Sequence, residues 1–92
     1  MIDKLEDDQK TEQVNFIIAN AYQANANYFE AIKLYEQIIN SGSIYESGSK
    51  WYLALCYLSV KHAERATPLL EELKESATSY SPKAKKLLDE LQ

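Results

Sequence analysis

Glycine, proline, cysteine and histidine are all scarce in this chain. These shortages exclude several kinds of fold and of chemical site. There are two glycines and two prolines, so long uninterrupted helices are permitted. The single cysteine, Cys56, excludes an internal disulfide and leaves the redox compartment open. The sequence also has no glycine-rich phosphate loop and no CxxC pair. None of the usual short motifs for nucleotides or thiol chemistry is therefore present.

Clustered basic charge is also missing. The formal net charge is −4, which argues against a nucleic-acid or anionic-membrane surface, because both need grouped Lys and Arg. The most apolar stretch, Trp51 to Val60, has only ten residues, whereas a membrane-spanning helix needs about 20. No signal peptide or transmembrane segment is recognisable. We therefore expect no membrane insertion, and the localisation stays open.

The residues that are present are typical of one small globular domain. Apolar residues make up 46% of the chain and charged residues 26%, which is ordinary for a globular protein. The polar residues 1–8 are expected to be a flexible lead-in, and residues 9–92 a single domain. The apolar stretch 51–60 has no solvent face of its own, so it is expected to be the central helix, covered on most sides.

Hydrophobic spacing predicts five helices and no strands, an all-α fold. Asn27 and Glu30 are spaced as a capping box that starts the second helix. Apolar residues share one face of each helix; the first helix has Val14, Ile17, Ile18 and Ala21, and the second has Tyr28, Ala31, Ile32, Tyr35, Ile38 and Ile39. The expected helices cover residues 9–24, 27–40, 44–60, 63–77 and 81–91.

The helices also repeat in pairs. Tyr57 falls on Tyr22, and Ala66 falls on Ala31, when the chain is shifted by 35 residues. The same shift places Leu53 on Ile18, Ala54 on Ala19, Leu70 on Tyr35 and Leu73 on Ile38. A period near 34 residues built from two helices is the pattern of a helical repeat protein.

At these positions the chain resembles the tetratricopeptide repeat family, whose pattern is W-x2-L-G-x2-Y, then A-x3-F, then P. The small residue and the tyrosine of the first helix match twice, as does the alanine of the second. Trp51 lies one place beyond the family tryptophan, and Ser43 and Thr78 replace the closing proline. The resemblance implies antiparallel helix–turn–helix repeats at about 12–45 and 47–78, stacked as an α-solenoid, with residues 81–91 as a terminal capping helix.

Sites for catalysis and for metals are weakly supported. Cys56 lies in the most apolar stretch and is expected to be a core residue. His62 is expected to be a solvated residue of a turn. The carboxylates of the fourth helix, Glu71, Glu72 and Glu75, read as a solvated face. The acidic trio Glu6, Asp7 and Asp8 suits a helix N-terminus better than a metal site. We therefore expect no enzyme activity, no cofactor and no metal.

The resemblance implies a concave groove, lined by the first helix of each pair, that receives a peptide or another protein. Carried over by alignment, the principal groove residues are Phe16, Asn20, Gln23, Trp51, Tyr52 and Leu55. Phe16 and Trp51 occupy places where family members that grip a C-terminal carboxylate have lysine, so an apolar segment is the better ligand. One alternative stays open, in which the fifth helix covers Trp51 and Leu55.

Two functions follow as expectations. The first is a protein-interaction module that binds a peptide or partner segment in the groove, with the partner unidentified. The second is a structural unit, either the C-terminal end of a longer array or a self-associating scaffold, with no independent ligand. An array fragment should show an exposed apolar face at its N-terminal end and tend to dimerise.

Overall fold

The computed structural model describes residues 4–42 and 44–91 of the chain. These residues form five helices and no strand, which confirms the all-α prediction. The helices are α1 (Lys4–Ala24), α2 (Tyr28–Asn40), α3 (Glu46–Ser59), α4 (Ala63–Glu75) and α5 (Ser81–Leu91). Ser43 and the side chains of Glu6, Asp7 and Asp8 lie outside the described residues, and so does the acidic-trio prediction that rests on those carboxylates.

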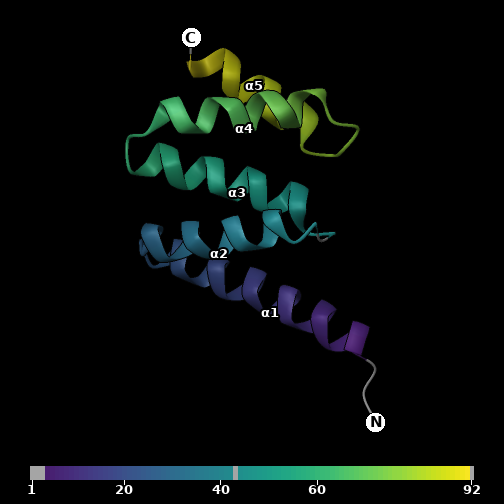
Figure 1. The fold of residues 1–92 in the computed structure, drawn as a ribbon. Coiled ribbons are helices and arrows are strands. Elements are labelled where there is room, and N and C mark those ends of the chain that lie inside the picture. The colour runs from purple at the N-terminus through teal and green to yellow at the C-terminus, as the bar shows by residue number, and fades with distance from the viewer. Residues whose placement is uncertain (1–3, 43, 92) are drawn as a thin grey trace.

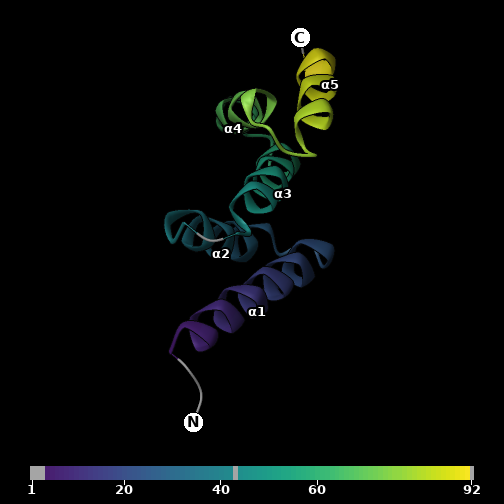
Figure 2. The ribbon, with the colours of Figure 1, turned by 90° about the vertical axis from the view of Figure 1, so that its right-hand side faces the viewer.

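The five helices form an elongated stack rather than a closed bundle. Each helix packs chiefly against its neighbours in sequence, and successive helices run antiparallel from α1 at one end to α5 at the other (Figure 1). The stack measures 52 × 30 × 17 Å. Turned by a quarter, it shows α1, α3 and α5 along one side and α2 and α4 along the other (Figure 2). This is the arrangement of a helical repeat.

One helix boundary differs clearly from that expected, and two others, the start of α3 and the end of α4, differ by two residues. Helix α1 begins at Lys4 instead of about residue 9, because residues 4–10 contain mainly good helix formers, with acidic residues near the positive end of the helix dipole. Helix α3 begins at Glu46 instead of about residue 44. The other ends agree to within two residues, the usual uncertainty of helix termini.

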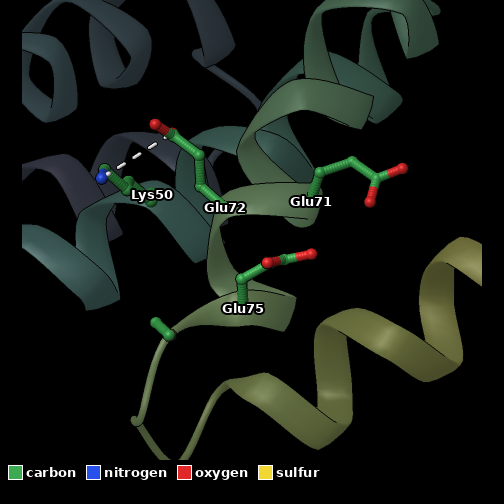
Figure 3. A pocket seen from close by; sticks show the side chains of 5 residues that line it. Lys50, Glu71, Glu72 and Glu75 are labelled. Atoms are coloured by element: carbon green, nitrogen blue, oxygen red, sulfur yellow. Dashed lines mark ion pairs between the residues drawn. The ribbon is translucent and has the colours of Figure 1, made fainter.

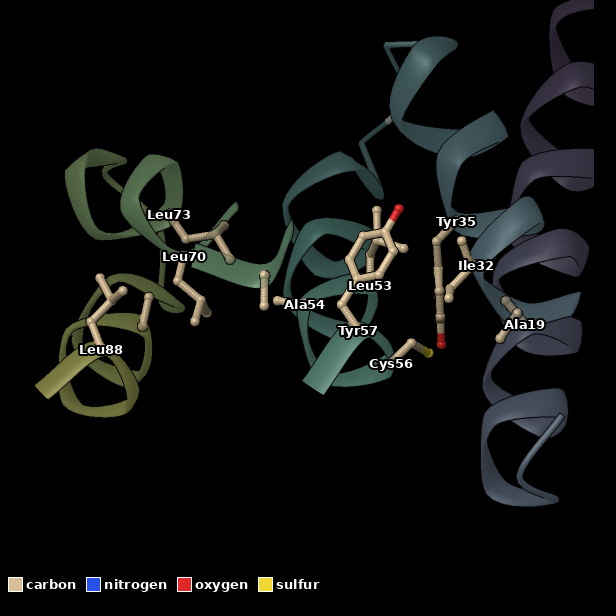
Figure 4. Packing of buried hydrophobic residues seen from close by; sticks show 13 residues of the cluster. Ala19, Ile32, Tyr35, Leu53, Ala54, Cys56, Tyr57, Leu70, Leu73 and Leu88 are labelled. Atoms are coloured by element: carbon tan, nitrogen blue, oxygen red, sulfur yellow. The ribbon is translucent and has the colours of Figure 1, made fainter. Parts of the chain in front are cut away.

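The core runs along the stack between α2, α3 and α4. Ala31, Tyr35 and Ile38 of α2 are almost wholly buried, which confirms the predicted stripe of that helix. From the next pair, Ala54 faces Leu70 and Leu73 of α4 (Figure 4). The buried side chains that continue this core are Ala19, Ile32, Leu53, Cys56, Tyr57, Ala66, Ala84 and Leu88.

The predicted inner face of α1 is wrong. Val14, Ile17 and Ile18 are 51%, 59% and 40% exposed, and Ala21 on the same face is exposed too. The side of α1 that packs on its neighbours carries Ala19, fully buried. The sequence pattern located an apolar face correctly, but α1 is the end of the stack and no described helix lies on that side.

The two helical turns repeat as closely as the helices do. Ala26 and Lys61, 35 residues apart, both adopt left-handed conformations, with φ of 64° and 66°. In the first turn the Asn27 N–H donates to the Tyr22 carbonyl at 2.8 Å. In the second turn the His62 N–H donates to the Tyr57 carbonyl at 2.7 Å. Both are therefore Schellman motifs, and the repeat exists in backbone geometry as well as in sequence.

The N-cap prediction at Asn27 is only half right. Asn27 does stand at the N-cap position of α2, but its side chain makes no capping hydrogen bond. Its backbone is already held on both sides, because its N–H donates to the Tyr22 carbonyl and its carbonyl accepts from Ala31 N at 3.1 Å. The Schellman turn, and not the capping box, therefore fixes the start of α2.

Candidate functional site

The side of the stack formed by α1, α3 and α5 carries all the residues that the sequence assigned to a groove. None of them is fully exposed or fully buried; the half-buried set is Phe16, Asn20, Gln23, Trp51, Tyr52 and Leu55. That these six residues form one binding groove stays a prediction.

Phe16 is the centre of an aromatic cluster that joins α1 to α3. Its ring stacks on Tyr45 with centroids 5.2 Å apart and meets the edge of Tyr52 at 5.9 Å. It also meets the buried Tyr35 of α2 edge-on at 6.1 Å. Aromatic pairs in these geometries each add roughly 0.5–1.5 kcal/mol beyond their buried area. The backbones of α1 and α3 touch little, so these rings fill the space between the two helices.

Gly48 extends this cluster toward α5. A Cβ atom at this position would lie 3.2 Å from Phe16 Cζ and 3.2 Å from the Tyr80 hydroxyl oxygen. The absence of a side chain therefore lets rings from two different elements approach the α3 backbone. Tyr80 in turn lies 6.1 Å, centroid to centroid, from Trp51. We call Phe16, Tyr45, Tyr52, Tyr80 and Trp51 the aromatic row.

The row ends at a basic pocket between α3 and α5. A cavity of about 300 Å³ is lined by Trp51 with Lys83, Lys86, Leu87 and Glu90. Lys83 Nζ lies 5.7 Å from the centroid of the Tyr80 ring, within the range of a cation–π contact. Helix α5 therefore flanks Trp51 and forms one wall of the site without burying it.

The amides of α1 have a structural task that the alignment did not show. Tyr35 is fully buried, and its hydroxyl accepts a hydrogen bond from Asn20 Nδ2 and donates one to Gln23 Oε1, both at 2.9 Å. Asn20 Nδ2 also donates to the Phe16 carbonyl at 2.8 Å. Burial raises the pKa of the Tyr35 hydroxyl well above its usual value. The two amides thus satisfy a buried polar group and are held in fixed orientations at the groove surface.

Cys56 and His62 lie where the sequence placed them. Cys56 is fully buried, and burial raises the pKa of its thiol to about 11, so almost none of it is the nucleophilic thiolate at neutral pH. His62 is exposed before α4, with Nδ1 2.9 Å from Glu64 Oε2. This hydrogen bond lowers the pKa of the Glu64 carboxyl. These contacts are those of a core residue and a solvated turn.

The acidic side of α4 forms an open pocket of about 560 Å³ against α3. Lys50 Nζ lies 3.7 Å from Glu72 Oε1 and 3.0 Å from Glu46 Oε2. Glu71 and Glu75 point away from Lys50, toward solvent (Figure 3). Within residues 4–42 and 44–91, no group of three or more His, Cys, Asp or Glu is arranged to hold a metal ion. This pocket is a charged surface whose acidic side chains do not point toward a common centre.

Comparison with protein-family models, with curated proteins and with solved structures gives no significant match. Among the described helices, none combines the length and apolar character that crossing a bilayer requires. The geometry of the site and the internal repeat are therefore the basis for any functional conclusion.

Sequence reasoning missed several residues of this surface, namely Tyr45, Gly48, Tyr80, Lys83, Lys86 and Leu87. Gly48 carried a usable signal, since a glycine near the start of an apolar helix often marks a close approach. The lysines carried none, because their position beside Trp51 depends on how α5 crosses α3.

Proposed function

We propose that this chain is a non-enzymatic protein-interaction module of tetratricopeptide-like architecture, and that the α1–α3–α5 face binds an extended peptide or a segment of a partner protein. The observation that carries the proposal is the aromatic row, which connects three elements of the stack across one face. Half-buried aromatic side chains held by their neighbours are typical anchors of protein interfaces.

The row is suited to binding because it is already ordered. Phe16 is fixed by three ring contacts, and Asn20 and Gln23 are fixed by the Tyr35 hydroxyl. Side chains that are held before binding lose little conformational entropy when a ligand arrives. Gln23 Nε2 also donates to the Tyr52 carbonyl at 3.5 Å. Asn20 therefore retains its amide oxygen and Gln23 one amide hydrogen, a pair that matches a peptide backbone group.

The charges on this face favour a particular ligand. On α1 the chain carries no charge from Gln13 to Ala24, the middle is aromatic and apolar, and the α5 end presents two lysines, Lys83 and Lys86, and one acid, Glu90, beside Trp51. The ligand that fits best is an apolar or aromatic segment with a carboxylate positioned for the α5 end.

The test uses the single tryptophan as a reporter. Trp51 is the only tryptophan of the chain, so its emission reports on the groove. A peptide selected from a random library against the whole chain should change that emission. Trp51→Ala should weaken the binding of that peptide by about 2 kcal/mol, the loss of one buried anchor, while the circular dichroism spectrum stays helical.

Phe29→Ala is the matched control. Phe29 is an aromatic residue of α2 that is 68% exposed, and it lines a pocket between α2 and α4 with Val60 and Arg65. Its removal should leave peptide binding unchanged. Equal binding by wild type and Trp51→Ala, together with loss in Phe29→Ala, would move the site to the α2–α4 side. Unfolding of Trp51→Ala, or complete shielding of Trp51 from a quencher, would make Trp51 a core residue.

A further inference from the structure

The outer side of α1 is an apolar surface that no described element covers. Val14, Ile17 and Ile18 are 40–59% exposed, and Ala21 is exposed on the same side. The other large exposed hydrophobic residues are scattered, with Phe29 on α2, Ile44 in the connection between α2 and α3, and Leu91 on α5. Single exposed hydrophobic residues are common on protein surfaces, whereas a group on one helix face marks an interaction surface. We call Val14, Ile17, Ile18 and Ala21 the α1 face.

The internal repeat shows what kind of surface the α1 face is. A shift of 35 residues places its four residues on Ser49, Tyr52, Leu53 and Cys56 of α3. Ser49, Leu53 and Cys56 are all buried, and Leu53 and Cys56 lie on the side of α3 toward Tyr35 of the preceding pair (Figure 4), whereas Tyr52 is half-buried. The α1 face is therefore the same helix-docking side, presented at the end of the stack without a helix against it.

Charge restricts what can cover the α1 face. From Gln13 to Phe29 the chain contains no Asp, Glu, Lys or Arg, so the covering surface must also be uncharged, or a charge would be buried without a partner. At the opposite end of the stack, α5 exposes Lys85, Lys86, Asp89 and Glu90. A head-to-tail contact between two copies would bring charges of α5 against the α1 face and is therefore less favourable than a contact between two α1 faces.

We propose that the α1 face binds the α1 face of a second copy of this chain, giving a closed two-fold dimer. An isologous contact uses the same patch on both subunits. The uncharged α1 face of one chain therefore packs against an identical uncharged face, even though each chain carries a net charge of −4. Val14, Ile18 and Ala21 lie on a different side of α1 from Phe16 and Asn20, while Ile17, the equivalent of Tyr52, borders the groove.

The side-chain sizes favour an antiparallel arrangement of the two α1 helices. Centred between Ile17 and Ile18, this arrangement places Ile17 opposite Ile18 of the second copy. It also places Val14 opposite Ala21 of the second copy, so that a larger side chain meets a smaller one at both ends. Interdigitation of large and small residues is what helix packing requires.

The first experiment measures the mass in solution over a dilution series, by sedimentation or light scattering. The wild-type chain should approach twice its 10.5 kDa mass at high concentration. Ile17→Asp should raise the dissociation constant roughly tenfold or more, because each carboxylate would be buried against apolar surface. A wild-type chain that stays at 10.5 kDa at every concentration overturns the proposal and leaves the α1 face to another protein or to a preceding repeat.

Ile44→Asp is the matched control, because Ile44 is 89% exposed and lies outside the α1 face. It should dimerise as the wild type does. A dimer that is lost in Ile44→Asp and kept in Ile17→Asp overturns the proposal. Should Ile17→Asp lose helicity in circular dichroism, Ala21→Arg serves instead, since Ala21 is exposed and arginine is a good helix former.

The second experiment tests the antiparallel arrangement. An equimolar mixture of Val14→Cys and Ala21→Cys chains should form a disulfide-linked dimer faster under mild oxidation than either chain alone. Residues seven apart lie about 10 Å apart along a helix, beyond the Cα separation of about 7 Å that a disulfide tolerates. Native Cys56 is fully buried and does not compete. Faster linking of Val14→Cys with itself overturns the antiparallel arrangement.

Discussion

The two helix pairs of this chain have the same turns and the same spacing, but different side chains fill the space between their helices. In the first pair the second helix buries Tyr35 fully, and Asn20 and Gln23 of the first helix satisfy its hydroxyl. In the second pair the residue equivalent to Tyr35 is Leu70, also fully buried. The positions equivalent to Asn20 and Gln23 hold Leu55 and Leu58.

This difference shows that the three positions form a unit. A buried hydroxyl needs hydrogen-bond partners, so the tyrosine of the first pair is accompanied by two amide side chains. The leucine of the second pair needs no such partner and is accompanied by two leucines. The pairs differ in coverage as well. Leu53 of the second pair is 3% exposed, while the equivalent Ile18 is 40% exposed, because α2 packs on α3 and no described helix packs on the outer side of α1. The same residue pattern therefore supports the core in one pair and forms a surface in the other.

The sharpest test of this comparison truncates the two equivalent residues. Leu53→Ala should lower the free energy of unfolding by about 2–5 kcal/mol, the usual loss for a buried leucine. Ile18→Ala should cost about 1 kcal/mol or less, since much of its side chain already contacts water. Urea unfolding at a concentration where the chain is monomeric measures both. Equal losses would mean that α1 is covered in solution even in the monomer.

A smaller effect is expected from overpacking two equivalent and fully buried alanines, Ala54 and Ala19. Ala54→Leu should cost roughly 1–3 kcal/mol, because α3 lies between α2 and α4 and cannot move away from either. Ala19→Leu should cost less, because α1 is free to shift outward on its open side. Thermal unfolding followed by circular dichroism compares the two. A larger loss in Ala19→Leu would show that α1 is held as firmly as α3.

The smallest effect concerns the hydroxyl that distinguishes the two pairs. Tyr35→Phe should cost about 0.5–1.5 kcal/mol at neutral pH, the net value of a typical hydrogen bond. Replacing Tyr35, Asn20 and Gln23 together by leucine, as in the second pair, should cost less than the sum of the three single changes. Additive losses, measured by urea unfolding of all four variants, would show that the three residues do not act as a unit.

The Tyr35 hydroxyl also predicts a pH dependence. Its pKa is raised in the folded state by burial, so the native protein keeps the proton at pH values where the unfolded chain releases it. Its contribution to stability is therefore complete below the ordinary tyrosine pKa of about 10 and is lost as the pH rises above that value. Tyr35→Phe should flatten this alkaline decline in urea titrations. Parallel profiles for the two chains would show that the hydroxyl is not shielded from water.

Periodicity predicted the elements of this fold because each apolar stripe is a local property of the chain. The stripe through Ala31, Tyr35 and Ile38 is buried as expected. The pattern failed at Val14, Ile17 and Ile18 because an apolar face does not reveal whether a neighbour covers it. Asn20 and Gln23 were placed on the correct surface, but their bonds to Tyr35 depend on the packing of another helix, which spacing within α1 cannot show.

The stacking of neighbours also affects how the chain reaches its native state. Because each helix packs chiefly on the next one in sequence, most contacts close short loops, and such topologies fold quickly. The α1–α2 hairpin and its Schellman turn contain only residues that precede α3, so this hairpin can form before the rest of the chain is synthesised. During translation, α2 would then provide the surface on which α3 docks, and α5 would be the last of the five described helices to be added.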